Sequence, residues 1–310
     1  MNLTHLRYMI EVDRLGSITK AAAALYMGQP NLSKAIKEME CELGIPIFKR
    51  SAKGVVATEK GREFLQYAKA IIVQMDKMES LYKDDPESYV NFQLLLPRAS
   101  YITHAFTCFL NKADRVEKME IKFKETNSMD AINEVVECEY NMGIIRYSLP
   151  YENFFVNIIE EKNLNHQEVW TFDLMLLMSK KSPMAKLSSI TGNVLNNYVE
   201  ILHGDNTVPN ISSAYQKRNT QMHGNKRHIF VYERGSQFDI LSSVPEAFMW
   251  VSPMPKEVLD RYGLVQKKCA DIKKTNRDIL IYQNNYRLSK TDNLFLNELN
   301  KVKRDIEDLF

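Results

Sequence analysis

The chain has 310 residues, of which 45% are hydrophobic, and this is enough to bury more than one core, so we expect two or three compact units. Its 41 basic and 39 acidic residues give a formal net charge of only +2, which excludes a chain that is cationic throughout and limits any nucleic-acid surface to a local patch. No apolar run reaches the roughly 20 residues of a membrane helix, and charges near the N-terminus exclude a signal peptide, so we expect a cytoplasmic protein.

Three short helices are predicted in residues 2–44. The first is amphipathic, covers 2–14 and ends at Gly16, after which Ser17 is the expected N-cap of a second helix over "ITKAAAALY". Gly28 provides the next turn, and Pro30 suits the first turn of a third helix, where no N–H is needed. The core face of this third helix follows at steps of 4, 3 and 4 residues in Leu32, Ile36, Met39 and Leu43.

Two short helices joined by a tight turn are typical of a helix-turn-helix, whose second helix enters the DNA major groove by its N-terminal end. Amide and hydroxyl side chains there read base edges, and lysines mostly neutralise phosphates. Pro30 is expected mainly to set the helix start, and contact with a thymine methyl group is the alternative. The alternative is a plain three-helix bundle whose polar face is only solvated. The predicted DNA contacts of this helix are Gln29, Pro30, Asn31, Ser33, Lys34 and Lys37.

Residues 45–61, "IPIFKRSAKGVVATEKG", predict a β-hairpin because two short apolar runs flank a basic turn around Gly54. Such a hairpin is a wing that brings cations beside the recognition helix. We add Lys49, Arg50 and Lys53 to the predicted DNA contacts.

A long helix is predicted after the wing, with Thr58 as its cap and Glu59 in its first turn. Apolar residues then recur at alternating steps of 4 and 3, which favours a seam through which two copies dimerise. The alternative is one more helix packed on its own domain, and 83–89 is the expected hinge. The predicted dimerisation residues are Phe64, Ala68, Ile71, Met75, Met78 and Tyr82.

Beyond Val90, short β-rich runs alternate with helical runs, a pattern that predicts an α/β architecture with mostly parallel sheets. Helical runs are expected between most of the strands, for instance over 101–112, 129–140 and 291–309. The expected strands cover 92–96, 120–124, 142–146, 171–179, 198–202, 228–232, 248–252 and 278–283.

Polar residues follow several of these strands, at the strand ends where open α/β sheets bind ligands. Ser100 and Ser128 are expected at helix N-termini, which attract anions, and arginines lie close by in the sequence. We therefore favour a small anionic effector, such as a carboxylate. Ordinary helix capping beside solvated arginines is the alternative. The predicted effector residues are Arg98, Ser100, Thr126, Asn127, Ser128, Arg146 and His203.

Signatures of catalysis are missing from the sequence, since it contains no phosphate-binding loop, no GxGxxG, no GxSxG and no HExxH. We expect no enzyme, no cofactor and no metal site. Two functions compete with that of a DNA-binding protein that responds to a small molecule. One is an enzyme fused to a helix-turn-helix, which would be recognised by turnover of its ligand. A transport receptor, recognisable by failure to bind DNA, is the other.

The four cysteines are too far apart in the sequence to suggest zinc or a disulfide framework, so we expect reduced thiols. Cys269 lies among lysines, which lower the pKa of a thiol. It is the candidate for a redox role, if the protein has one.

The order of elements over about sixty residues resembles the N-terminal winged helix-turn-helix of LysR-type transcriptional regulators. Gly28 departs from this pattern, because a serine usually caps the recognition helix there, and losing that cap costs a few tenths of a kcal/mol with glycine. The matching residues are Gly16-Ser17, Ala21-Ala22, Leu25, Gln29-Pro30, Leu32-Ser33, Ile36, Glu40, Leu43-Gly44, Phe48-Lys49-Arg50, Thr58-Glu59 and Gly61.

The resemblance implies an N-terminal all-α winged helix-turn-helix with a long linker helix, followed by an α/β effector domain like periplasmic binding proteins. The implied DNA-binding domain covers 1–60, and the linker helix with its hinge covers 58–89. The effector domain would cover 90–310, with subdomain I at 91–163 plus 269–310 and subdomain II at 164–268. Its implied partners are double-stranded DNA, a small-molecule effector, and further copies of the chain in a homodimer or homotetramer.

Overall fold

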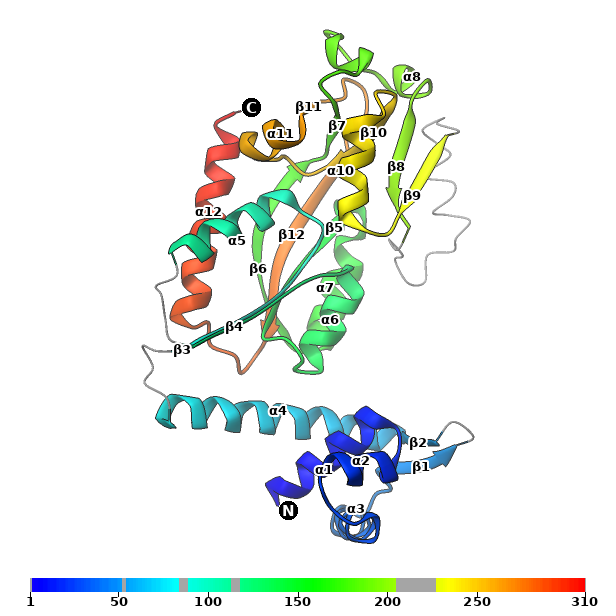
Figure 1. Cartoon of the computed structure of the whole chain (residues 1–310), viewed down its shortest axis with the longest axis vertical. Helices are drawn as coiled ribbons and strands as arrows, with labels where there is room; N and C mark the ends of the chain where they lie inside the picture. The colour runs from blue at the N-terminus through cyan, green and yellow to red at the C-terminus, as the bar shows by residue number, and fades with distance from the viewer. Residues whose placement is uncertain (1, 52–53, 84–88, 113–117, 205–226, 310) are drawn as a thin grey trace. The chain divides into compact units, whose positions relative to one another are not determined.

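The computed structural model describes all residues except 1, 52–53, 84–88, 113–117, 205–226 and 310 (Figure 1). The chain divides into two compact units, Met1–Tyr89 with Val136–Glu139 and Val90–Val135 with Tyr140–Phe310. The domain bounds drawn from the sequence stay predictions.

The first unit opens with three helices whose ends follow simple capping rules. The Asn2 side chain accepts from the Thr4 amide, Ser17 accepts from the Lys20 amide, and Gly16 and Gly44 end helices in the left-handed conformation. Their inner faces form one core with the linker helix. The helices are α1 (Leu3–Leu15), α2 (Ile18–Ala24) and α3 (Gln29–Leu43), and the fully buried side chains include Leu6, Met9, Val12, Leu32 and Met39.

The wing is an antiparallel hairpin of β1 (Phe48–Ser51) and β2 (Gly54–Ala57). The Glu40 carboxylate of α3 accepts the amides of Ile47 and Phe48 at 2.7 and 3.0 Å, so the recognition helix and the wing are fixed to each other. Gly61 is required where the linker helix passes this hairpin, because a Cβ there would lie 2.0 Å from the Ile47 carbonyl oxygen.

The linker helix α4 (Glu59–Lys83) begins where the Thr58 hydroxyl accepts the Gly61 amide at 2.9 Å. One face of this helix joins the core of its own unit through Leu65, Ala68 and Ile72. Ala68 is therefore completely buried within a single copy.

The second unit contains two five-stranded sheets, and we call each sheet with its helices a lobe. The first lobe has the strand order β4-β3-β5-β12-β6 and the second β11-β7-β10-β8-β9. The first lobe's strands are β3 (Tyr89–Leu96), β4 (Lys118–Glu125), β5 (Met142–Ser148), β6 (Leu164–Asp173) and β12 (Thr275–Gln283). The second lobe's strands are β7 (Met175–Ser179), β8 (Val199–His203), β9 (His228–Val231), β10 (Ala247–Val251) and β11 (Leu264–Lys267).

Helices cover both faces of the first sheet. One face carries α5 and α12, which pack together over a core of aromatic side chains around Phe92 (Figure 1). The helices of this lobe are α5 (Ser100–Lys112), α6 (Ser128–Val136), α7 (Glu152–Glu161) and α12 (Lys290–Glu307). A 3-10 turn at Leu149–Tyr151 precedes α7 in the same lobe. The second lobe contributes α8 (Gly192–Leu195), α10 (Arg234–Ser243) and α11 (Lys256–Tyr262), with a 3-10 turn at Pro183–Lys186.

The sheets are mixed, so the expectation of mostly parallel sheets was wrong. The chain crosses between the lobes twice, after β6 and before β12, and the returning strand β12 lies antiparallel to both β5 and β6. The strand expected over 171–179 is two strands, because the first crossing occurs at Leu174. The strands named from the sequence did not include β11, and the helices named as instances did not include α7, α10 and α11.

Candidate functional site

The outer face of α3 carries the predicted DNA contacts. Leu32, Ala35, Ile36 and Met39 point into the core, and the residues between them remain outside. The exposed predicted contacts are Gln29, Pro30, Asn31, Lys34 and Lys37, and Ser33 is partly exposed. The structure therefore leaves the charged and amide groups of this helix accessible.

Local contacts at the start of α3 replace the missing side-chain cap at Gly28. Gly28 has no side chain to cap the helix, but its backbone carbonyl accepts the backbone amides of Asn31 and Leu32. The Gln29 amide donates to the Ser33 hydroxyl at 3.2 Å. Lys34 lies 3.8 Å from Glu38 with 78% of its side chain exposed, so solvent screens this pair and the lysine stays available.

On the wing, Lys49 is exposed. Arg50 belongs to β1, but its side chain lies outside the described residues, and Lys53 lies outside them altogether. Their roles on DNA stay predictions.

The predicted dimerisation residues do not share one environment. Ala68 is buried and Phe64 packs against the core of its own unit, whereas Ile71 and Met78 are 39% and 54% exposed. Tyr67, which sequence reasoning did not select, is 67% exposed. Met75 is partly exposed, and the side chain of Tyr82 lies outside the described residues. The outward apolar stripe is therefore Tyr67, Ile71 and Met78.

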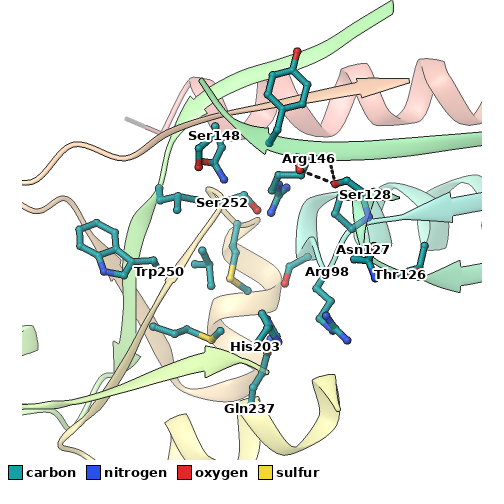
Figure 2. A pocket seen from close by; sticks show the side chains of 18 of the residues that line it. Arg98, Thr126, Asn127, Ser128, Arg146, Ser148, His203, Gln237, Trp250 and Ser252 are labelled. Atoms are coloured by element: carbon teal, nitrogen blue, oxygen red, sulfur yellow. Dashed lines mark hydrogen bonds between the residues drawn. The ribbon is translucent and has the colours of Figure 1, made fainter. Parts of the chain in front are cut away.

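All seven predicted effector residues line a single cavity of about 270 Å³ between the lobes of the second unit (Figure 2). Arg98 and Ser100 come from the start of α5, and Thr126, Asn127 and Ser128 from the start of α6. Arg146 lies on β5 and His203 at the end of β8. Among the described residues that line this cavity, none is acidic.

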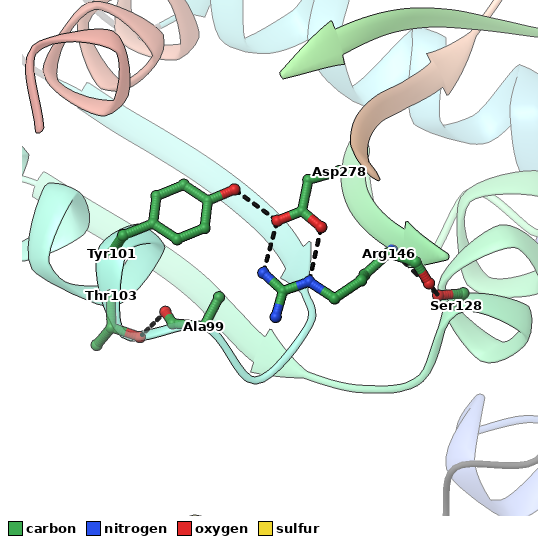
Figure 3. A network of polar contacts seen from close by, with 6 residues as sticks. All are labelled: Ala99, Tyr101, Thr103, Ser128, Arg146 and Asp278. Atoms are coloured by element: carbon green, nitrogen blue, oxygen red, sulfur yellow. Dashed lines mark hydrogen bonds and ion pairs between the residues drawn. The ribbon is translucent and has the colours of Figure 1, made fainter. Parts of the chain in front are cut away.

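Arg146 is already paired inside the protein (Figure 3). Its guanidinium donates to both carboxylate oxygens of Asp278 at 2.7 Å, and the Tyr101 hydroxyl donates to the same carboxylate at 2.5 Å. Burial lowers the pKa of Arg146, but the attraction of Asp278 outweighs it and the net pKa is raised. Burial, followed by the Asp278 charge, raises the pKa of Tyr101 well above its usual value. The Arg146 charge is thus largely neutralised before any ligand arrives.

Ser128 and Asn127 of the cavity wall already form hydrogen bonds within the protein. The Ser128 hydroxyl donates to the Arg146 carbonyl at 2.7 Å and accepts the Arg146 amide at 3.1 Å. The Asn127 side chain caps α6 by accepting the amides of Met129 and Asp130 at 3.1 and 3.0 Å. These contacts fix the N-terminus of α6 at the cavity wall.

A second arginine connects the lobes beside the cavity. Arg234 of α10 donates to the hydroxyls of Thr103 at 2.7 Å and Ser100 at 2.9 Å, and pairs with Glu125. In addition, Arg98 of the first lobe donates to the Tyr232 carbonyl of the second at 3.1 Å. We call the contacts of Arg234 the Arg234 latch.

Apart from His203, sequence reasoning missed the wall of the cavity that the second lobe provides. This wall is largely apolar and comes from residues far from the selected strand ends. Hydrophobic residues on a β-strand do not distinguish a cavity wall from a core, so no signal in the sequence marked them. They are Gln237, Phe238, Met249, Trp250, Val251, Ser252 and Met254.

Cys269 is not activated by its lysine neighbours. Its Sγ lies 3.3 Å from the Asp271 carboxylate, and burial raises the pKa of the thiol. The described part of the chain contains no group of three or more His, Cys, Asp or Glu side chains arranged to hold a metal. No helix within the described ranges combines the length and the apolarity needed to cross a bilayer.

A family model described as "Bacterial regulatory helix-turn-helix protein, lysR family" matches residues 3–62. Residues 3–62 therefore match the helix-turn-helix domain of the LysR family. The regulator BenM of Acinetobacter baylyi is 42% identical over 83 residues, which are 27% of either chain. BudR of Raoultella terrigena is 24% identical over 68% of this chain and 70% of its own. The match to BenM thus covers about a quarter of that protein.

Solved structures share the fold of this chain over nearly its whole length. A full-length variant of OxyR from Pseudomonas aeruginosa matches with a TM-score of 0.63 at 16% identity, over 97% of this chain and 95% of its own. LysG of Corynebacterium glutamicum, whose structure contains a bound effector, Arg, matches with a TM-score of 0.63 at 12% identity over 99% of both chains. The fold prediction, a winged helix-turn-helix followed by an α/β domain, is confirmed. The curated relatives are named transcriptional regulators, which agrees with the prediction that this chain is not an enzyme.

Proposed function

We propose that the protein is a DNA-binding transcription regulator whose activity responds to a small anionic effector in the cavity between the lobes. One observation carries this proposal: a LysR-family helix-turn-helix with an exposed recognition face is joined, in one chain, to an α/β unit with a cavity. Such a regulator acts on DNA in the cytoplasm.

Specific DNA contacts are assigned to Gln29, Asn31 and Ser33, because amide and hydroxyl groups read base edges at the start of a recognition helix. Lys34, Lys37 and Lys49 supply phosphate contacts and make binding depend on salt. A homodimer places two recognition helices on two half-sites, and the apolar stripe of Tyr67, Ile71 and Met78 on α4 is the face assigned to the partner copy.

The anionic character of the effector rests on the cavity's electrostatics. The N-termini of α5 and α6 both reach the wall, and each favours negative charge through its amides and its dipole. Arg98 adds a cation, and the described lining contains no carboxylate to oppose an anion. Arg146 contributes little, because Asp278 already balances it.

Effector binding shifts the population of lobe arrangements, which changes how the paired winged helices span their site. A ligand that contacts both lobes has the required differential affinity, because it binds the closed arrangement better than an open one.

Genome-wide DNA pull-down with the purified full chain tests the proposal. We expect enrichment of a few sites with two-fold symmetry, loss of those sites with Asn31→Ala, and weaker binding at every site with Lys34→Ala. Lys181→Ala, at an exposed position of the second unit, is the matched control and should leave the enrichment unchanged. Equal recovery by wild type and Asn31→Ala would contradict the assignment of the recognition face.

A further inference from the structure

Gln237 is a buried polar side chain at the cavity whose amide oxygen has no hydrogen-bond partner among the described residues. It lies on α10, is 4% exposed and lines the cavity at the side of His203 (Figure 2). Its Oε1 finds no hydrogen-bond donor within the described part of the chain. Burying an acceptor without a donor is unfavourable, so this oxygen marks a position where a ligand group is expected to donate.

The position of Gln237 is fixed by its neighbours on α10. Arg234 lies one helical turn before Gln237 and forms the Arg234 latch to the first lobe. The residue after Gln237, Phe238, stacks on Tyr262 with 4.6 Å between the two ring centroids. Residues at this spacing share one face of a helix, and this face is turned to the cavity and the first lobe. The free oxygen is therefore held in place by contacts on both sides.

The surface around Gln237 is mostly apolar. The second lobe contributes Phe238, Met249, Trp250, Val251 and Met254 to the cavity wall. The groups that attract an anion, which are the two helix N-termini and Arg98, lie on the first lobe. A ligand that fits both walls has an anionic end toward the first lobe and an apolar body toward the second.

We propose that the effector is a small carboxylate with an apolar, one-ring or branched body that carries an O–H or N–H group, and that Gln237 Oε1 accepts this hydrogen. The proposal rests on the proposed function, which places an anionic effector in this cavity. The volume of about 270 Å³ lies near the lower end of small-molecule sites, roughly 300 Å³, and favours a body of this size. The bond to Gln237 anchors the ligand to α10 while its carboxylate binds the first lobe, so one molecule holds both lobes.

Pairs of acids that differ only in the donor test the inference. Isothermal titration calorimetry of the full chain compares hydroxybenzoates and aminobenzoates with the corresponding methoxybenzoates and with benzoate. An aliphatic pair, 2-hydroxy-4-methylpentanoate against 4-methylpentanoate, covers branched bodies. We expect at least one donor-bearing acid to bind about tenfold or more tightly than its partner without the donor, since the unmet acceptor is then left buried.

The variant Gln237→Met keeps the length of the side chain and removes the acceptor. In Gln237→Met, the donor-bearing acid and its partner without the donor should bind with nearly equal affinity. In Gln167→Met, at an exposed position on β6, the difference in affinity should be preserved. Equal binding of both members of every pair by the wild type overturns the donor inference and leaves the anionic effector standing. Failure of every acid to bind overturns the carboxylate inference, and the proposed anionic effector is then tested separately with inorganic phosphate and sulfate.

Thermal unfolding of the ligand-free chain gives a second readout that needs no ligand. Because Gln237 Oε1 is buried without a donor, Gln237→Met should raise the melting temperature. A lowered melting temperature would mean that the amide is satisfied within the protein, and would overturn the assignment of Gln237 as a ligand acceptor.

Discussion

Arg146 shows how a residue selected as a ligand contact can serve mainly to hold the fold. Its guanidinium balances Asp278, whose side chain is completely buried. Removing the cation leaves that carboxylate with the Tyr101 hydroxyl as its side-chain partner among the described residues, so Arg146→Met should lower the free energy of unfolding by about 3–5 kcal/mol. Urea denaturation of the full chain measures the loss.

The double variant Arg146→Met/Asp278→Leu tests whether the loss of stability comes from leaving the Asp278 carboxylate unpaired. Apolar replacement of both partners of a buried ion pair is often nearly neutral, so most of the stability should return. Arg287→Met, at an exposed arginine, is the matched control. A single variant as stable as the wild type would show that Asp278 does not need this partner. Loss of ligand binding in an Arg146 variant is consequently a poor test of the effector site.

Cys269 differs in reactivity from what its lysine neighbours in the sequence predict. Burial raises the pKa of its thiol, and a raised pKa means that less thiolate is present at neutral pH. Iodoacetamide should therefore modify Cys269 more slowly than the exposed Cys41, and the rate at Cys269 should rise only at more alkaline pH. Mass spectrometry of the modified peptides over neutral and alkaline pH measures both rates. Faster modification of Cys269 than of Cys41 at neutral pH would restore its candidacy for a redox role.

At the scale of elements, α4 shows what periodicity does and does not determine. Apolar residues at steps of 4 and 3 correctly predicted a long helix. They could not assign its faces, because a stripe that packs on its own domain and a stripe that meets a partner have the same spacing. The structure buries Ala68 in the first unit and leaves Tyr67, Ile71 and Met78 exposed.

The exposed stripe on α4 gives a prediction about assembly. Ile71→Glu places a charge on this face, and analytical ultracentrifugation should show dissociation into smaller species while the helical circular dichroism is retained. Gln66→Glu, exposed on another side of α4, should leave the assembly intact. Ala68→Glu should instead destabilise the domain itself, because Ala68 is buried within one copy. An unchanged sedimentation profile for Ile71→Glu would remove this stripe from the interface.

The sequence predicted the first-lobe wall of the cavity better than the second-lobe wall. Strand ends followed by polar residues located the first-lobe wall, because helices begin there and their N-termini attract anions. The second-lobe wall depends on where the chain crosses between sheets, and the crossing at Leu174 lies within a continuous β-rich run. Gln237 and Trp250 reach the cavity through tertiary packing alone, and neither follows a recognisable turn.

Polar contacts join the two lobes of the second unit beside the cavity, and we call the arrangement that has these contacts closed. Arg234 is the centre of these contacts, since it binds Ser100 and Thr103 and pairs with Glu125. Arg234→Met removes the Arg234 latch and leaves Glu125 without that cation, while the bond from Arg98 to the Tyr232 carbonyl remains. The closed arrangement should then be less populated, and a carboxylate that needs both lobes should bind more weakly in proportion to that population.

Trp250 reports this opening directly, because it lies at the cavity and the sequence contains only one other tryptophan, Trp170. In a Trp170→Phe background, Arg234→Met should shift the emission of Trp250 to longer wavelength and increase its quenching by acrylamide, since the cleft admits more water. Arg261→Met, at an exposed position on α11, is the matched control and should change neither signal. Identical quenching in the Arg234 variant and the control would mean that packing of the lobes, and not the Arg234 latch, keeps the cavity closed.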